Sequence, residues 1–382
     1  MRLPNGDIYL DYNATTPIDP QVLEGMEPYQ SLQFGNPSSN HTLGRVAKRA
    51  IESAREQVSR LIQCKPEEII FTSGGSESNN MAIKGIAASR GGRGQHIVVS
   101  HIEHPAILDV VNYLQHHGYR ITYLPVDGQG VVSIQELQDI ITSKTILVSV
   151  MHANNEVGTI QPVSEISEIA HRAGAVVHSD AAQSLGKVPV DVDQLGCDLL
   201  SLAGHKFYAP KGVGALYKKA DVDLVPLIHG ADHEDGLRAG TENVAQIVGL
   251  GLAAQIAAKE LEKERARIQD LRDRLQYNLK KAFPEMRVNA GNTSRLPNTL
   301  SISFAGTISQ NILESLENVM VSAGAACHSG AKKGSGVLEA MHIPLEYQTG
   351  TIRISLGRFC DEAIVADASR ILIEKISALL DT

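Results

Sequence analysis

Apolar runs and helical patterns alternate along the chain between residues 47 and 220. Several segments between the runs place apolar residues at helical spacing, as Ile134, Leu137 and Ile140 do. Strands that alternate with helices predict crossover connections and a mostly parallel sheet, so we expect an α/β fold. The run ILVSVM is apolar on both faces, as a sheet covered by helices on both sides requires. The runs span residues 68–72, 96–100, 121–126, 145–151, 176–179, 199–203 and 214–217.

A long helix is predicted over residues 256–283, because apolar positions recur along it at helical spacing among many charged residues. Shorter strands at 300–304 and 352–356 and a closing helix follow it. A chain of 382 residues favours two domains. We therefore expect a large domain over residues 15–260 and a smaller α+β domain formed by residues 1–14 and 261–382.

The charge pattern argues against two classes of partner. The net charge of −8 is spread along the chain without a basic run, so neither nucleic acid nor an anionic membrane is expected to bind. We find no signal core at the N-terminus and no run of about 18 apolar residues. The four cysteines form no CxxC pair, which favours a reduced compartment. These features predict a cytoplasmic protein without a membrane span.

Polar residues follow five of the apolar runs, at the expected carboxyl ends of the strands. In open α/β sheets this edge is where ligands bind. The first group is rich in glycine and opens a helix pattern, so a phosphate site or a simple capped helix start would explain it. It matches neither GxGxxG nor a Walker loop, which disfavours a dinucleotide or ATP. The groups span residues 72–80, 101–105, 154–156, 179–183 and 204–206.

An acid and a lysine in these groups carry the candidate chemistry. Asp180 ends a buried strand, where its carboxylate needs a cation: either an Arg or Lys side chain or a protonated ring nitrogen. Lys206 could be an ordinary surface residue or, with a lowered pKa, a lysine that forms a Schiff base. A flat, phosphorylated, cationic-ring cofactor would account for all five groups together.

No metal is expected. His101 and His104 lack further ligands, and the stretch with His229, His233 and Glu234 contains no HExxH motif. The thiol of Cys327 differs from the other cysteines because small, flexible residues surround it, which suggests exposure.

The chain resembles the cysteine desulfurases, which are class-V aminotransferase-fold (fold type I) enzymes dependent on pyridoxal 5'-phosphate, and it is similar to their selenocysteine lyase branch. The similarity covers nearly the whole chain, and its motifs occur in family order. They read YLDYNATTP, FGNPSS, FTSGGSESNN, HANNEVG, DAAQSLGK, AGHKFYAPKGVGALY, LRAGTEN, RLPNT, GAACHSG and IRISLGR.

The resemblance implies a role for each matching residue around the cofactor ring. Lys206 would hold the cofactor covalently, and Asp180 would pair with its pyridinium nitrogen. His104 would stack on the ring, while Gln183 and Asn155 would form hydrogen bonds near its phenolic oxygen.

The resemblance also implies how the phosphate and the substrate are bound. Gly75, Ser76 and His205 would bind the phosphate. Thr241 would contact the phosphate of the other subunit, which makes the protein an obligate homodimer. Arg353 would bind the substrate carboxylate, for which Asn155 is a further contact.

The implied reaction removes sulfur from L-cysteine. Lys206, released by the substrate amine, would take the α-proton, and the Cys327 thiolate would then attack the substrate sulfur, leaving alanine and a persulfide. Sulfur-acceptor proteins, such as those of iron–sulfur cluster assembly, would be partners.

Two departures from the family pattern bear on this reading. Ala203 stands where many desulfurases have a phosphate-binding serine. The sequence Cys327-His328-Ser329 is more similar to selenocysteine lyases, so release of selenide from L-selenocysteine is the close alternative. A transaminase or other lyase, in which Cys327 is incidental, and a non-catalytic scaffold for sulfur relay are the remaining alternatives.

Overall fold

A seven-stranded sheet forms the centre of the larger part of the molecule. The computed structural model describes residues 1–323 and 335–380. Six strands of the sheet run parallel to one another, and β8 is antiparallel to both of its neighbours. The predicted α/β class with a mostly parallel sheet is confirmed, and each of the seven predicted runs forms a strand. In spatial order these are β2 (Ile69–Thr72), β8 (Gly214–Lys218), β7 (Leu199–Ala203), β6 (Val176–Asp180), β5 (Thr145–Ser149), β3 (His96–Ser100) and β4 (Arg120–Leu124).

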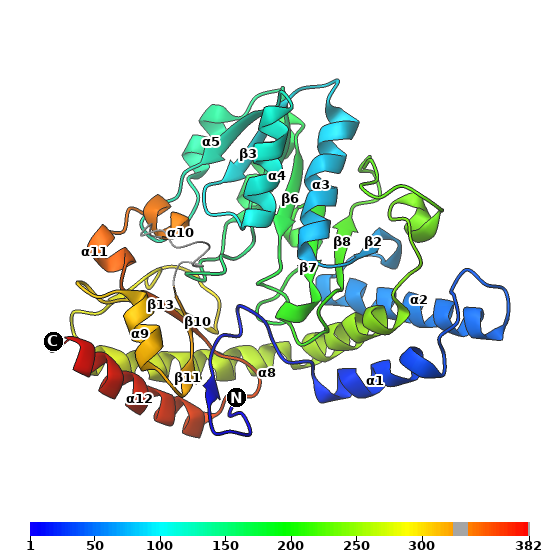
Figure 1. Ribbon diagram of the computed structural model, residues 1–382. Coiled ribbons are helices and arrows are strands. Elements are labelled where there is room, and N and C mark those ends of the chain that lie inside the picture. The colour runs from blue at the N-terminus through cyan, green and yellow to red at the C-terminus, as the bar shows by residue number, and fades with distance from the viewer. Residues whose placement is uncertain (324–334, 381–382) are drawn as a thin grey trace.

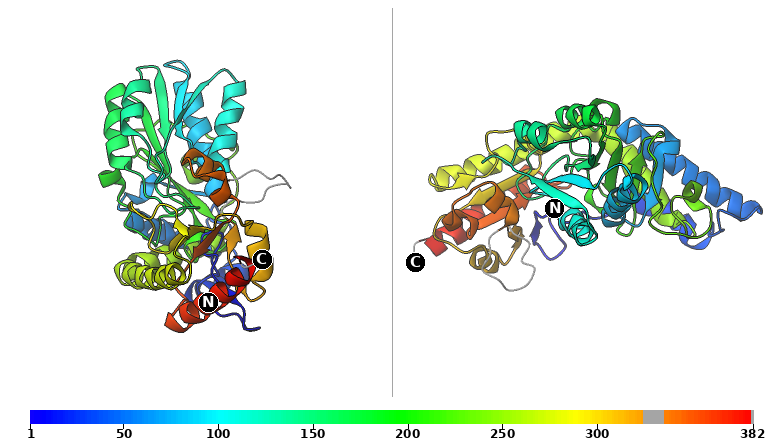
Figure 2. Two further views of the ribbon diagram at one scale, coloured as in Figure 1. Left: turned by 90° about the vertical axis from the view of Figure 1, so that its left-hand side faces the viewer. Right: turned by 90° about the horizontal axis from the view of Figure 1, so that it is seen from above.

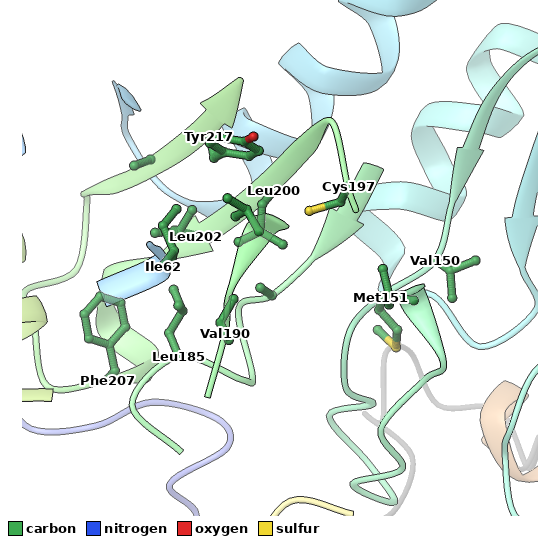
Figure 3. Packing of buried hydrophobic residues seen from close by; sticks show 14 of the residues in the cluster. Ile62, Val150, Met151, Leu185, Val190, Cys197, Leu200, Leu202, Phe207 and Tyr217 are labelled. Atoms are coloured by element: carbon green, nitrogen blue, oxygen red, sulfur yellow. The ribbon is translucent and has the colours of Figure 1, made fainter. Parts of the chain in front are cut away.

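Helices cover both faces of this sheet, as Figures 1 and 2 show. On β3, Ile97 and Val99 pack with α3 and α4, whereas Val98 between them joins the core on the opposite face. Each such buried side chain contributes about 1.5–3 kcal/mol. Figure 3 shows part of the core that Val98 joins, including Leu200, Leu202 and Phe207. The covering helices are α3 (Gly75–Arg90) and α4 (Pro105–His116) on one face and α2 (Thr42–Ile62), α5 (Ile134–Ile140), α6 (Val163–Ala173) and the first half of α8 on the other.

A smaller unit with its own core lies beside the sheet. Its four-stranded antiparallel sheet has the order β12-β13-β10-β9, and the N-terminal β1 pairs with β11 in the same unit. The predicted strands 300–304 and 352–356 correspond to β10 and β13. The elements are β1 (Ile8–Tyr9), β9 (Arg287–Val288), β10 (Thr299–Ser303), α9 (Ser309–Ser315), β11 (Val319–Met320), β12 (Ser322–Ala323), β13 (Thr351–Ser355) and α12 (Glu362–Leu380). Two short helices of the same part of the chain, α10 (Gly336–Ala340) and α11 (Leu345–Gln348), pack instead against the core of the large sheet.

Helix α8 (Val244–Ala282) connects the two units and starts 12 residues before the predicted start at residue 256. The prediction relied on a charged face, which the first turns lack because α1 and α2 cover them. This contact is close: a Cβ on Gly251 would lie 2.6 Å from the Cα of Ala54. The remaining elements are α1 (Pro20–Ser31), α7 (Val192–Leu195) and the 3₁₀ turns η1 (Pro66–Glu68), η2 (Gly204–Lys206) and η3 (His233–Gly236).

The two halves of α8 belong to different hydrophobic cores. Its buried residues up to Ala257 join the core of the large sheet, and those from Ile268 onward join the core of the small unit. We propose that the two domains divide within this helix, near residue 260.

By length and composition alone, α8 is also long and apolar enough to cross a membrane, with 44% of its most apolar window buried inside the structure. One such helix is weak support for a membrane span, because the core helix of a folded protein meets the same criterion.

Candidate active site

A cavity lies at the carboxyl ends of the parallel strands, where the sequence places its polar groups. It encloses about 1110 Å³, including the part open to solvent, and residues of both units line it. Nine of the eleven predicted site residues lie around it. They are Gly75, Ser76, His104, Asn155, Asp180, Gln183, His205, Lys206 and Arg353.

The glycine-rich segment after β2 brings the N-terminus of α3 to the cavity. Gly74 precedes the helix with φ of 151°, a conformation that favours glycine, and no side chain caps the helix. The capped helix start considered above is therefore not found in this part of the chain. Gly75 also allows a close approach, since a Cβ there would lie 3.2 Å from the Cβ of Ala203. The first-turn amides of α3 and the positive end of its dipole suit an anion.

Asp180 ends β6 with only 7% of its surface exposed. Its carboxylate accepts hydrogen bonds from Asn79 Nδ2 at 2.8 Å and from the Ala182 amide at 2.9 Å. Among residues 1–323 and 335–380, no Lys, Arg or His forms an ion pair with Asp180. A buried carboxylate without a cation is costly, so this acid fits a ligand that brings a positive charge, such as a protonated ring nitrogen.

Lys206 enters the cavity from η2, directly after β7. Its Nζ donates to the carbonyl oxygens of Asn13 and Ala14, each at 2.8 Å. Burial, followed by the charge of Arg353, lowers the pKa of Lys206 to about 8. A lysine that is readily neutral near physiological pH is suited to forming a Schiff base.

Asn13, which the sequence analysis did not single out, connects several of these residues. Its carbonyl accepts from Lys206 and from Gln183 Nε2, and its Nδ2 donates to the carbonyl of Asn155 at 3.2 Å. The motif YLDYNATTP contains Asn13, but nothing in the local pattern indicates that this segment reaches the carboxyl ends of distant strands.

Arg353 extends from β13 of the small unit and is 7% exposed. Its Nη2 forms an ion pair with Asp11 at 2.7 Å, and its Nη1 donates to the Asn155 carbonyl at 3.1 Å. Its Nε is buried, and no acceptor for it occurs in the described residues. Arg353 lines the cavity, and a guanidinium is suited to binding a carboxylate.

Two histidines line the cavity: His104 accepts a hydrogen bond, and His205 is neutral. His104 caps α4 by accepting the Ala106 amide on Nδ1 at 3.1 Å. His205 Nδ1 lies 3.1 Å from Thr15 Oγ1. Burial and the nearby charge of Lys206 lower the pKa of His205 to about 4, so its ring is neutral at pH 7.

Glu156 is a second cavity residue that the sequence analysis did not assign a role. Burial raises its pKa to about 7, and it accepts a hydrogen bond from Ser335. Ser322 and Ala323 also line the cavity. Cys327 lies outside the described residues. The described residues on either side of its segment, Ala323 and Ser335, lie beside the cavity.

Thr241 is the one described site candidate that lies apart from the others. It is exposed and lines a different pocket, with Arg238, Glu242 and Phe71. Its predicted contact is with a second subunit, so its role stays a prediction. Across the described ranges, no three His, Cys, Asp or Glu side chains gather as metal ligands would.

Comparison with known proteins agrees with the cavity's chemistry. The family model for class-V aminotransferases matches residues 8–366. The cysteine desulfurase IscS of Dictyoglomus turgidum is 46% identical over 98% of this chain and 96% of its own length. A solved NifS-like protein superimposes with a TM-score of 0.91 at 38% identity, covering 97% of this chain and 99% of its own. The SspA protein, solved in complex with cysteine, has a TM-score of 0.81 at 37% identity and covers 91% and 98%. The chain therefore belongs to the class-V aminotransferase family and, within it, to the pyridoxal-phosphate-dependent cysteine desulfurases.

Proposed function

We propose that this protein takes sulfur from L-cysteine, releases L-alanine and carries the sulfur as a persulfide on Cys327. The observation that carries the proposal is one cavity with a lysine of lowered pKa, a buried acid that forms no ion pair with the described residues, and a buried guanidinium, contributed by Lys206, Asp180 and Arg353. These are the groups needed to hold an amine-reactive, cationic-ring cofactor and an amino-acid carboxylate side by side.

The residues around the cavity would hold pyridoxal 5'-phosphate as follows. Lys206 would bind it covalently, and Asp180 would keep the ring nitrogen protonated. The α3 N-terminus at Gly75 and Ser76 receives the phosphate together with His205. Because Ala203 provides no hydroxyl, the backbone amides of α3 carry more of the phosphate binding.

The ring contacts come from the other side chains of the cavity. His104 would stack on the ring, and Gln183 and Asn155 would face its phenolic oxygen. Thr241 of a second subunit completes the phosphate site, which makes the enzyme a homodimer.

Three side chains of this chain then act on the substrate. Arg353 orients the cysteine by its carboxylate, with Asn155 beside it. Lys206, neutral in a substantial fraction near pH 8, takes the α-proton. The cofactor, when bound, would supply an electron-accepting ring.

Sulfur transfer requires the thiolate of Cys327. Its electron pair forms the new S–S bond as the substrate's C–S bond breaks. The substrate carbon keeps the electron pair of the broken bond and, after protonation, leaves as alanine. The persulfide sulfur passes to an acceptor protein, such as one that assembles iron–sulfur clusters, in the cytoplasm.

The alternative substrate is L-selenocysteine, which would release selenide and alanine. The observation favouring it is the sequence Cys327-His328-Ser329. The same residues would serve both substrates, so only relative turnover separates the two.

The test measures alanine, sulfide and selenide released by the purified holoenzyme with each amino acid under identical conditions. The proposal predicts alanine from cysteine, and a fall of at least about 100-fold in Lys206→Ala, because the base is lost. Lys219→Met, which changes an exposed lysine, is the matched control and should retain activity. Alanine formation by Lys206→Ala at the wild-type rate would contradict the proposal, and a preference for selenocysteine would favour the alternative.

A further inference from the structure

Lys187 is a second lysine beside the cavity, and the proposed reaction does not use it. It follows β6 and is largely buried, and its Nζ donates to Gln183 Oε1 at 2.7 Å and to Asn13 Oδ1 at 3.2 Å. Burial, with the charges of Lys206 and Arg353, holds the pKa of Lys187 well below its usual value. A lysine kept in this costly position needs a reason.

The two hydrogen bonds fix the orientation of the Gln183 amide. A lysine Nζ that donates to two partners requires oxygen atoms at both, so Oε1 of Gln183 must face Lys187. Its Nε2 then faces the other way, and one of its two hydrogens goes to the Asn13 carbonyl at 2.9 Å. The described residues give Nε2 no second acceptor, and Gln183 lines the cavity. Gln183 is thereby held as a donor at the cavity instead of an acceptor.

Asn13 and Gln183 differ in how far their side-chain orientation depends on Lys187. Its Nδ2 already donates to Thr299 Oγ1 at 2.8 Å and to the Asn155 carbonyl, while its Oδ1 accepts from Asn298 Nδ2 at 2.9 Å. Asn13 is therefore fixed by the scaffold, whereas Oε1 of Gln183 has Lys187 as its only donor among the described groups. Without Lys187, only the hydrogen bond from Nε2 to the Asn13 carbonyl holds the Gln183 amide, so its orientation is less strictly fixed.

We propose that Lys187 is a positioning residue that holds Gln183 as a hydrogen-bond donor to the cofactor and so sets the proton affinity of the linkage at Lys206. The inference rests on the proposed function, in which Gln183 faces the phenolic oxygen. A donor to that anionic oxygen draws negative charge away from the neighbouring nitrogen, which then binds its proton less tightly. Loss of Lys187 should therefore raise the pH at which the cofactor's visible absorbance changes.

A purely electrostatic effect of the Lys187 charge would act in the same direction, and a double-variant cycle separates the two. Lys187 lies next to the lining residue Gln183, and the charged or titratable groups that line the cavity are Lys206, Arg353, Asp180, Glu156, His104 and His205. If the Lys187 charge acts directly, its effect on the pH midpoint of the visible absorbance persists when Gln183 is replaced by leucine. A positioning effect disappears, because Lys187 then has no amide to hold.

The experiment titrates the visible absorbance of the holoenzyme with pH for wild type, Lys187→Met, Gln183→Leu and the double variant. We expect Lys187→Met to raise the midpoint by about 0.5–1 unit, and by less than about 0.3 unit when Gln183 is already leucine. The control Lys219→Met should leave the midpoint unchanged. If Lys187→Met lacks the wild-type circular dichroism, Lys187→Leu, which likewise cannot donate to Gln183, replaces it under the same criteria.

Two results would overturn the inference: a midpoint for Lys187→Met within about 0.2 unit of wild type, or an equal shift in both backgrounds. A wild-type protein that develops no visible absorbance with the cofactor would instead contradict the proposed function. The two failures are therefore distinguishable.

Discussion

Replacing Lys206 with methionine should stabilise the cofactor-free protein near pH 7 and destabilise it near pH 10. The folded state lowers the pKa of Lys206 from its usual 10.5 to about 8, first through burial and then through the charge of Arg353. Below pH 8 the lysine is protonated in both the folded and the unfolded chain, and the folded chain carries a disfavoured charge. A shift of this size corresponds to about 3 kcal/mol of unfolding free energy.

The sign of the pH dependence follows from proton binding. Between pH 8 and 10.5 the unfolded chain binds more protons at Lys206 than the folded chain does, so the free energy of unfolding of the wild type rises with pH. Above that range the amine is neutral in both states, and the penalty is gone.

Methionine removes the charge but also the two hydrogen bonds to Asn13 and Ala14. Each lost hydrogen bond costs about 1 kcal/mol. At pH 7 the lifted penalty of about 3 kcal/mol outweighs this loss, so Lys206→Met should be more stable by about 1 kcal/mol. At pH 10 most of the penalty has disappeared from the wild type, and the variant should be less stable by about 1 kcal/mol.

Urea unfolding of cofactor-free wild type and variant, followed by circular dichroism at pH 7, 8.5 and 10 and at equal protein concentration, measures this difference. Lys219→Met, which changes an exposed lysine, should give a difference that is flat with pH. A flat difference for Lys206→Met as well would refute the reasoning, because the lysine would then not be held at a lowered pKa.

Three further predictions concern other parts of the structure. Burial raises the pKa of Glu156 to about 7, so between pH 4.5 and 7 the folded chain binds more protons there than the unfolded chain does. As the pH rises across that window, the free energy of unfolding of wild type, measured in urea, should fall by about 3 kcal/mol relative to that of Glu156→Gln. A difference that stays constant with pH would refute this prediction. Gly357→Ala would place a Cβ 2.1 Å from the buried ring of Tyr12 and should cost about 2–3 kcal/mol in thermal unfolding, whereas Gly92→Ala, with open space around it, should cost less than about 1 kcal/mol. Asp180→Asn removes a charge-assisted hydrogen bond and should weaken cofactor binding about 10- to 100-fold, measured by titrating the visible absorbance; unchanged affinity would argue against a charged ring at this acid.

Much of the central sheet could be predicted from the sequence because its strands are buried on both faces. Continuous apolar runs such as β5 and β7 have a pattern that hardly depends on the rest of the fold. The position of polar residues after these runs then places Asp180 and Lys206 at one edge, since parallel strands share their carboxyl ends. The cavity could therefore be located without any knowledge of side-chain contacts.

The parts that could not be predicted depend on long-range contacts. The backbone amide of Asn13 is held by Ser355 Oγ at 2.9 Å, across most of the length of the chain, and Asp11 pairs with Arg353 in the same way. No local pattern encodes such pairings. The first turns of α8 were also missed, because apolar residues on nearly every side leave no polar face from which a period can be read.

The central claim is that a cofactor on Lys206 delivers substrate sulfur to Cys327. The most direct measurement mixes the holoenzyme with one equivalent of L-cysteine, without a reductant, and determines by peptide mass which cysteine has gained one sulfur atom. The account predicts the added sulfur on Cys327 in the wild type and none in Lys206→Ala. Added sulfur on Cys64, Cys197 or Cys360 with Cys327 unmodified, or on Cys327 equally in Lys206→Ala, would contradict it.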